Sequence, residues 1–169
     1  MNTEPQKSAV LIAGPTASGK SALALRLARE RDGVIINADS MQVYAELRLL
    51  SARPSLAEEE LAPHRLYGHV SGAEDYSVAR WLAEATREIE AVWVAGKLPI
   101  ICGGTGLYFM ALEKGLSDVP PIAPEIREAW RGFSGDLHGE LTKRDRVMAA
   151  RLGANDRQRI IRALEVIDS

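Results

Sequence analysis

The residues with the clearest chemical meaning form a glycine-rich run near the start of the chain, Gly14-Pro15-Thr16-Ala17-Ser18-Gly19-Lys20-Ser21. The run satisfies the spacing G-x-x-x-x-G-K-[ST] of a phosphate-binding loop, or P-loop. Its glycines allow main-chain N–H groups to surround a diphosphate, and a following helix adds the positive end of its dipole. Lys20 adds a point charge, and the Ser21 hydroxyl is a ligand for Mg²⁺. The pattern predicts a site for a diphosphate or nucleotide.

Asp39 is the second group with a chemical role. It follows the apolar run Val34–Asn37 and so lies at the carboxyl end of an expected strand, where parallel sheets place their sites. Beside a phosphate-binding loop, such a carboxylate either ligates Mg²⁺ or accepts a proton as a general base. The residues alone leave both assignments open.

These groups need a scaffold, and the apolar pattern predicts one. Short apolar runs predict buried parallel strands at Ala9–Ala13, Val34–Asn37 and Leu98–Cys102. Helix-forming runs follow at Ser21–Arg31, Ser77–Ala95 and Leu107–Leu112. A second glycine turn, Gly103–Gly106, precedes the last of these helices. This alternation predicts an α/β fold, a P-loop NTPase-like parallel sheet flanked by helices.

The longest predicted helix has signals at both ends, because Ser77 is a good N-cap and Gly96 a good terminator. Its expected core residues are Trp81, Leu82, Ile89 and Val92. The preceding stretch from Ala52 to Ser77 contains prolines and glycines, so we interpret it as a loop with one short helix that covers the site.

The last part of the chain differs in character. After a break marked by Pro120, Pro121 and Pro124, helices are predicted at Glu125–Trp130, Thr142–Leu152 and Asp156–Ile167. We expect a single P-loop core over residues 1–169, with a helical C-terminal portion at 125–169. Arg127–Arg162 carry nine Lys and Arg against five Asp and Glu, a balance of +4 in a chain of net charge −2. Such a basic region either meets a polyanion or forms solvated helix faces.

Composition and cysteine usage bound the class of protein. Hydrophobic residues make up 46% of the chain and charged residues 26%, which excludes a mostly disordered protein. No apolar run approaches the length of a membrane span, and Met1–Lys7 show no signal region, so we expect a cytoplasmic protein without a membrane segment. The single cysteine, Cys102, permits no internal disulfide and is expected to be buried. We expect the chain to act as a monomer.

The phosphate-binding loop together with the run Asp39–Tyr44 resembles the tRNA dimethylallyltransferase family, also called isopentenyl-diphosphate:tRNA transferases. Similar family blocks stand, in order, at Ser51–Pro54, His64–Leu66, Tyr76–Ser77, Gly103–Tyr108 and Asn155–Val166. Together they cover nearly the whole chain. Family members are longer, with further helices after the last block, so we expect this chain to lack that remainder.

The resemblance implies transfer of a dimethylallyl group from dimethylallyl diphosphate to N6 of adenine 37 in tRNA, with Mg²⁺ and with release of diphosphate. It implies Asp39 as the base, Lys20 and the loop as holders of the leaving group, and Thr105 as a residue that orients the reacting groups. The residues that it implies in contact with the tRNA anticodon loop are Asp39, Ser40, Met41, Gln42, Thr105, Gln158, Arg159, Ile160, Ile161 and Arg162. By its position, Arg127 is expected to contact the tRNA as well.

Other functions remain open at this point. A nucleotide or small-molecule kinase shares the loop and the core, because phosphate binding does not name a reaction. An isopentenyltransferase acting on free adenine nucleotides shares the chemistry, whereas a pure binding module leaves Lys20 and Asp39 without a task. From spacing alone, solvated surface is the better explanation of Arg159 and Arg162, and the family block reverses that preference. The blocks Asp39–Tyr44 and Gln158–Arg162 favour the tRNA enzyme.

Overall fold

The computed structural model describes residues 7–117 and 121–169. The chain divides into two compact units, Met1–Leu116 and Ser117–Ser169, and each has a hydrophobic core of its own. The division comes a few residues before the expected start of the helical portion at residue 125. The expected helical portion, residues 125–169, lies within the second unit.

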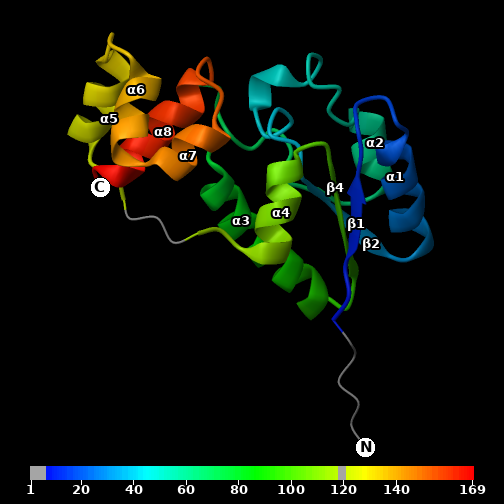
Figure 1. The fold of residues 1–169 in the computed structure, drawn as a ribbon. Helices are drawn as coiled ribbons and strands as arrows, with labels where there is room; N and C mark the ends of the chain where they lie inside the picture. The colour runs from blue at the N-terminus through cyan, green and yellow to red at the C-terminus, as the bar shows by residue number, and fades with distance from the viewer. Residues whose placement is uncertain (1–6, 118–120) are drawn as a thin grey trace, which may run out of the picture. The chain divides into compact units, whose positions relative to one another are not determined.

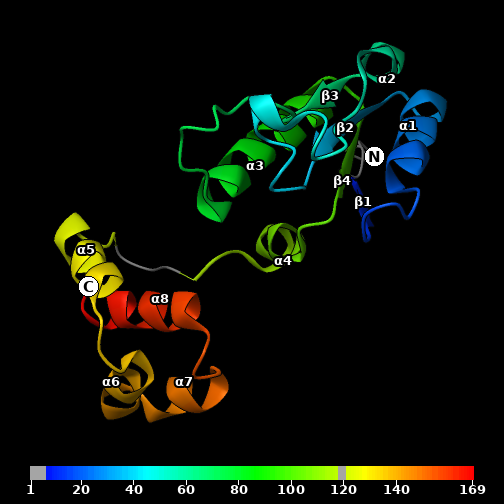
Figure 2. The same cartoon turned by 90° about the horizontal axis from the view of Figure 1, so that it is seen from above.

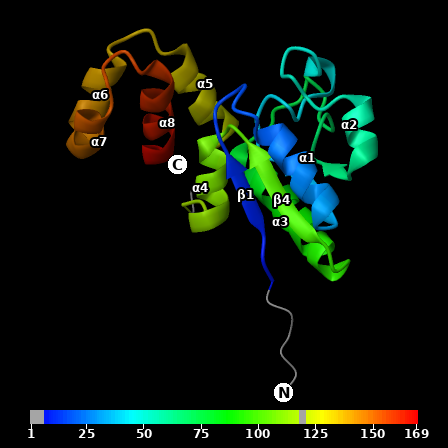
Figure 3. The same ribbon diagram turned by 90° about the vertical axis from the view of Figure 1, so that its right-hand side faces the viewer.

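The first unit is built on a parallel sheet of four strands in the order β1-β4-β2-β3 (Figure 1). The strands are β1 (Val10–Ala13), β2 (Gly33–Asn37), β3 (His64–Arg65) and β4 (Leu98–Gly103). Figure 3 shows β1 and β4 side by side. Ala13 pairs with Gly103, and Asn37 pairs with Cys102, so β1, β4 and β2 end level with one another. The turns that follow these three strands are thereby brought to one edge.

Helices cover both faces of this sheet (Figure 2). The helix α1 (Lys20–Glu30) packs on one face against Ile12, Ile35 and Ile100. The helices α3 (Val78–Val94) and α4 (Gly106–Lys114) pack on the other face against residues that include Ile36 and Ile101. Consecutive strand residues point to opposite faces, so Ile35 and Ile36 enter different cores. The predicted α/β sheet flanked by helices is confirmed.

The connection between β2 and α3 has little regular structure, as predicted. It contains a short 3₁₀ turn, η1 (Ala45–Leu47), and the helix α2 (Leu56–Leu61), which begins with a capping box between Ser55 and Glu58. The predicted cap of α3 is confirmed, since the Ser77 hydroxyl accepts a hydrogen bond from Arg80 N over 3.2 Å. Strand β3 was missed in the sequence, because two residues are too few to show an alternating pattern.

The predicted core residues of α3 behave as expected: Trp81, Ile89 and Val92 are buried, and Leu82 is partly buried. The helix ends at Val94, and Gly96 follows with a φ of 72°. No helix in residues 7–117 and 121–169 combines the length and the apolar character needed to cross a lipid bilayer.

The second unit is helical: α5 (Pro124–Gly132), α6 (Leu137–Arg144), α7 (Arg146–Arg151) and α8 (Arg157–Ile167). Its core contains Trp130, Leu137, Leu141, Ala149, Ile160 and Leu164. The predicted continuous helix Thr142–Leu152 is wrong, because Asp145 has an extended conformation and separates α6 from α7. The Asp145 carboxylate accepts a hydrogen bond from Met148 N and so begins a new helix.

Candidate active site

The phosphate-binding loop leaves the end of β1 and is held against the end of β4. Gly14 N donates a hydrogen bond to Gly103 O over 3.3 Å. The loop then turns through two residues of positive φ, Ala17 at 63° and Gly19 at 82°. Glycine adopts this region freely, whereas alanine does so only when its surroundings enforce it. The loop therefore has a defined shape before it meets a ligand.

Main-chain donors of the loop are free for an anion. Among the described residues, no group accepts a hydrogen bond from the N–H of Ala17, Gly19, Lys20 or Ser21. They stand at the N-terminal end of α1, where the helix dipole also favours negative charge. The Lys20 ammonium donates to Pro15 O over 3.2 Å and keeps two further N–H groups. This arrangement suits a diphosphate, as the spacing predicts.

Asp39 lies across the same edge, after the end of β2. Its Oδ1 accepts a hydrogen bond from Met41 N over 3.0 Å, which fixes the direction of the carboxylate. A Cβ atom built on Gly104 would lie 3.4 Å from Asp39 Oδ2 and 3.4 Å from Gly14 O. Gly104 thus separates the carboxylate from the phosphate-binding loop by little more than the thickness of one main chain. The structure brings these two predicted parts of the site together.

Thr105 links the two turns that follow β4 and β2. Its Oγ1 accepts a hydrogen bond from Ser40 N over 2.9 Å and lies 3.3 Å from Ser40 Oγ, to which it donates. Thr105 N also donates to Ala38 O over 3.1 Å. The hydroxyl proton of Thr105 is therefore used within the protein. The two hydrogen bonds of this hydroxyl hold Ser40 in position.

Gln42 is also held by its neighbours. Its side-chain Nε2 donates to Ser51 O over 2.8 Å and to Ala52 O over 3.3 Å, so both N–H bonds of the amide are used. Gln42 O accepts a hydrogen bond from Gly68 N. The amide oxygen of Gln42 remains for a substrate. Met41, by contrast, is about half exposed and is free to meet one.

The charges of the site act on a buried thiol beneath it. Burial raises the pKa of Cys102 to about 11, the Lys20 ammonium opposes this rise, and the Asp39 carboxylate adds to it. The opposing effects show that both charges of the site lie near the end of β4. The thiol stays neutral and buried, as expected for the single cysteine.

A hydrogen-bonded network that the sequence did not reveal supports this region. Glu84 on α3 accepts hydrogen bonds from Tyr76 over 2.7 Å and from Arg80 over 3.0 Å, and it pairs with His69 over 2.9 Å. Val70, next to His69, exchanges main-chain hydrogen bonds with the 43–45 segment. The network therefore anchors the strand-like segment beside Asp39–Gln42. The only sequence signal was the spacing of Arg80 and Glu84, four residues apart on a helix.

In the second unit, the charged residues predicted to contact tRNA lie on the surface. Arg159 has a side chain that is 75% exposed and pairs with Asp156 at 3.2 Å. Arg162 is 52% exposed and pairs with Glu165 at 3.3 Å. Both pairs are local, so each guanidinium has donors left for a phosphate. Gln158 and Arg127 are exposed as well.

The prediction for Ile160 needs correction. Its side chain is 0% exposed and belongs to the core of the second unit, so it cannot reach an RNA. Ile161 is half-buried against the same core. The helical period explains why Ile160 differs from Arg159. Within residues 158–162 of α8, some side chains face the core and others face the solvent.

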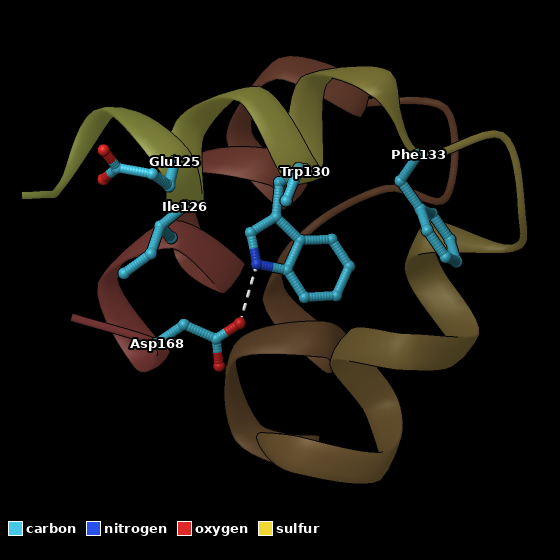
Figure 4. A pocket seen from close by; sticks show the side chains of 6 residues that line it. Glu125, Ile126, Trp130, Phe133 and Asp168 are labelled. Carbon is cyan, nitrogen blue, oxygen red and sulfur yellow. Dashed lines mark hydrogen bonds between the residues drawn. The ribbon is translucent and has the colours of Figure 1, made fainter.

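A cavity of about 350 Å³ also lies in the second unit (Figure 4). Its lining residues are Glu125, Ile126, Ala129, Trp130, Phe133 and Asp168. The Trp130 indole donates to Asp168 Oδ2 over 2.8 Å, as the figure shows. Two carboxylates and an apolar wall disfavour a phosphate, so this cavity is no part of the phosphate chemistry.

Mg²⁺ is compatible with the residues at the loop. The described residues contain no group of three or more His, Cys, Asp or Glu side chains that could hold a metal. Mg²⁺ commonly takes one or two protein ligands and completes its shell with substrate phosphates and water. Ser21, exposed on the first turn of α1, offers such a ligand.

Comparisons with known proteins show the family of this chain. A family model described as IPP transferase matches residues 42–169, and a model described as isopentenyl transferase matches residues 7–70. A relative named tRNA dimethylallyltransferase from Methylobacterium sp. (strain 4-46) is 60% identical over 164 residues, which cover 94% of this chain and 54% of the relative. The protein of the same name from Azorhizobium caulinodans is 60% identical over 166 residues, 95% of this chain and 53% of the relative. The chain spans about half the length of these relatives.

Solved structures show the same likeness. A eukaryotic dimethylallyltransferase seen in crystals acting on tRNA matches with a TM-score of 0.82 and 33% identity over 95% of this chain and 41% of that one. The tRNA isopentenylpyrophosphate transferase of Bacillus halodurans matches with a TM-score of 0.64 and 35% identity over 96% of this chain and 56% of that one. With a family model that covers most of its length, this chain belongs to the IPP transferase family.

Proposed function

We propose that this chain carries the catalytic core that transfers a dimethylallyl group from dimethylallyl diphosphate to N6 of adenine 37 in the anticodon loop of tRNA. One observation supports the proposal: Gly104 lies between Gly14 O and Asp39 Oδ2, so the phosphate-binding loop and the Asp39 carboxylate share one edge of the sheet. The likeness to tRNA dimethylallyltransferases supports the choice of substrates.

On the donor side, the reaction breaks the bond between the allylic carbon and the diphosphate oxygen, and the electron pair stays on that oxygen. The free N–H groups of the loop and the Lys20 ammonium meet the negative charge that develops there. Ser21 would hold Mg²⁺ beside the phosphates, and the ion would supply further charge neutralisation. Diphosphate is released after the transfer.

On the acceptor side, N6 of adenine forms a bond to the allylic carbon and loses a proton. The amine is a weak nucleophile because its lone pair is delocalised into the ring, so a base that takes this proton assists the attack. Asp39 Oδ2 is the atom for this role, since Oδ1 is occupied by Met41 N–H. The adenine must leave the RNA stack to reach it.

The RNA itself is held by contacts of two kinds. Ser40, Met41 and Gln42 follow Asp39 directly, Thr105 is bonded to Ser40, and these four residues are the proposed contacts of the extruded nucleotide. Arg127, Gln158, Arg159 and Arg162 of the second unit are exposed and suit the phosphate backbone.

The test uses the purified chain with labelled dimethylallyl diphosphate and unmodified tRNA, followed by nucleoside analysis. We expect labelled N6-dimethylallyladenosine at position 37. Transfer to free adenine nucleotides but not to tRNA would point to the related enzyme class, and transfer of the γ-phosphate of ATP would point to a kinase. A longer form, with the length of the relatives, is assayed in parallel.

A second experiment separates the two roles open to Asp39. Asp39→Asn keeps the size of the side chain and removes its basicity, so a base role predicts a loss of turnover on the order of 10²–10⁴-fold with normal diphosphate binding. A role as Mg²⁺ ligand predicts weaker diphosphate binding that recovers at high Mg²⁺ concentration. Rescue of the rate by Mg²⁺ would exclude Asp39 as the base.

A further inference from the structure

Asn37, the last residue of β2, uses its side chain to hold the main chain of Asp39 from both sides. Its Oδ1 accepts a hydrogen bond from Asp39 N over 2.9 Å, and its Nδ2 donates to Asp39 O over 2.9 Å. The residue is 0% exposed. A buried amide with this geometry leaves the main chain of Asp39 little freedom to rotate.

The second N–H of the same amide reaches another segment. Asn37 Nδ2 also donates to Leu66 O over 3.1 Å. Leu66 has a φ of 61°, a conformation that is disfavoured for any residue with a Cβ atom and needs support from its surroundings. Asn37 therefore joins Asp39 to the segment after β3, and both donors of its amide are used.

Asn37 is itself fixed from α3. The Trp81 indole donates to Asn37 O over 2.8 Å, and Trp81 is fully buried and stacked on Tyr108 with 4.2 Å between ring centroids. The main chain of Asn37 is thus held by a buried, stacked side chain. A change in the Asn37 side-chain amide therefore acts on the position of Asp39.

We propose that Asn37 is a positioning residue for the transfer reaction and that it acts through Asp39. The inference rests on the proposed function of Asp39 as base. A carboxylate takes a proton efficiently only from a well-defined position, and a misplacement on the order of 1 Å can cost 10²-fold in rate. The amide is specifically suited, because both a donor and an acceptor must face Asp39. Aspartate at this position would turn a carboxylate oxygen toward the carbonyls of Asp39 and Leu66.

Asn37→Ala tests the proposal by single-turnover kinetics and by calorimetry with inorganic diphosphate. We expect the rate of transfer to fall by about 10- to 100-fold while diphosphate affinity is unchanged. Asn37→Ser restores one acceptor for Asp39 N and recovers part of the rate. Ile36→Val, a core substitution on the same strand, is the control and keeps the rate. Parallel losses of rate, diphosphate affinity and folded fraction in the Asn37 variants would show a merely structural role and overturn the proposal.

A double-mutant cycle shows whether Asn37 acts through Asp39. In the Asp39→Asn background, Asn37→Ala should cost no further rate, because the group that it positions has already lost its basicity. Additive losses would overturn the proposal.

Amide hydrogen exchange gives a readout that needs no activity. In Asn37→Ala, exchange of the Asp39 N–H should become about tenfold faster, the equivalent of one lost hydrogen bond, while the amides of β4 keep their protection. Unchanged exchange at Asp39 would overturn the proposal even in an active enzyme. If exchange at Asp39 became faster in Asn37→Ala but the chain transferred no dimethylallyl group, the proposed function would be wrong. The hydrogen bonds from Asn37 to Asp39 would still be confirmed as a restraint on Asp39.

Discussion

The hydroxyl of Thr105 accepts a hydrogen bond from Ser40 N over 2.9 Å, although 65 positions separate the two residues in the chain. The bond joins the turn after β4 to the turn after β2. Since Ser40 follows Asp39 directly, Thr105 helps to set the distance between the carboxylate and the glycine turn at Gly103–Gly106.

Thr105→Ala removes this link. A hydrogen bond of this kind stabilises by about 0.5–1.5 kcal/mol, so we expect the single-turnover rate to fall by about 2- to 10-fold, with diphosphate affinity unchanged. Thr105→Ser keeps the hydroxyl, so its single-turnover rate should stay close to that of the unchanged protein. An alanine variant with the full rate would show that the link has no part in catalysis.

Lys20→Ala removes the charge at the phosphate-binding loop. A hydrogen bond to a charged group contributes about 1.5–3 kcal/mol, so diphosphate affinity measured by calorimetry should fall by roughly 10- to 100-fold. Lys97→Ala is the matched control, because Lys97 forms a surface ion pair with Asp32 and lies at the other end of the sheet from the loop. Equal losses in the two variants would mean that only net charge matters.

Arg159→Ala and Arg162→Ala should each weaken tRNA binding and lower the salt dependence of that binding by about one released counterion. Both side chains are exposed, so folding should change little. Arg29→Ala removes an exposed charge from α1 and controls for net charge. If Arg29→Ala lowers the salt slope equally, the face of α8 has no special role.

Glu84 makes the first unit sensitive to acid. Burial would raise the pKa of Glu84, but hydrogen bonds from Tyr76, His69 and Arg80 outweigh it and lower the pKa from 4.5 to about 2. The folded state thus holds this proton less readily than the unfolded chain, so the network stabilises the fold above pH 4.5 and this contribution disappears as the pH falls toward 2. This contribution to the free energy of unfolding is roughly 3 kcal/mol.

Denaturant unfolding between pH 4.5 and 2 measures this contribution. Glu84→Gln should lower stability at the upper end of the window and flatten its dependence on pH. Glu90→Gln, an exposed change on the same helix, should keep the slope of the unchanged protein. If the stability of Glu84→Gln fell with pH as steeply as that of the unchanged protein, other carboxylates would cause the acid sensitivity.

Ile160→Ala should destabilise the second unit by about 2–5 kcal/mol, and Ile160→Val by about 0.5–1.5 kcal/mol, because the side chain is fully buried. Diphosphate binding by the first unit should persist in both variants, since that unit has its own core. If Ile160→Ala weakened tRNA binding at full stability, its side chain would have to contact the RNA after all.

Local signals in the sequence predicted much of the fold. The phosphate-binding loop and the strands β1, β2 and β4 were predicted because glycine spacing and apolar runs act over a few residues. Asp145 broke a predicted helix because its side chain competes for a main-chain N–H, which an apolar period does not show. The roles of Asn37 and Glu84 were not predicted, since each also has a partner in a more distant segment, Leu66 for Asn37 and His69 for Glu84.

Ile160 illustrates a different limit of prediction from sequence. A block shared with a family shows which residues recur together, but only the helical period shows which of them face solvent. In α8 that period places Ile160 and Leu164 in the core and leaves Arg159 and Arg162 outside.

The level ends of β1, β4 and β2 have a consequence for how this site can change over evolution. One strand, β4, separates the strand that leads to the phosphate-binding loop from the strand that leads to Asp39, so the spacing between them is two strand separations, about 10 Å. Main-chain hydrogen bonds set that spacing, and no exchange of side chains alters it. For the proposed reaction, new acceptors or longer prenyl donors must therefore be accommodated by the loops around the site, while the separation of the two strands stays constant.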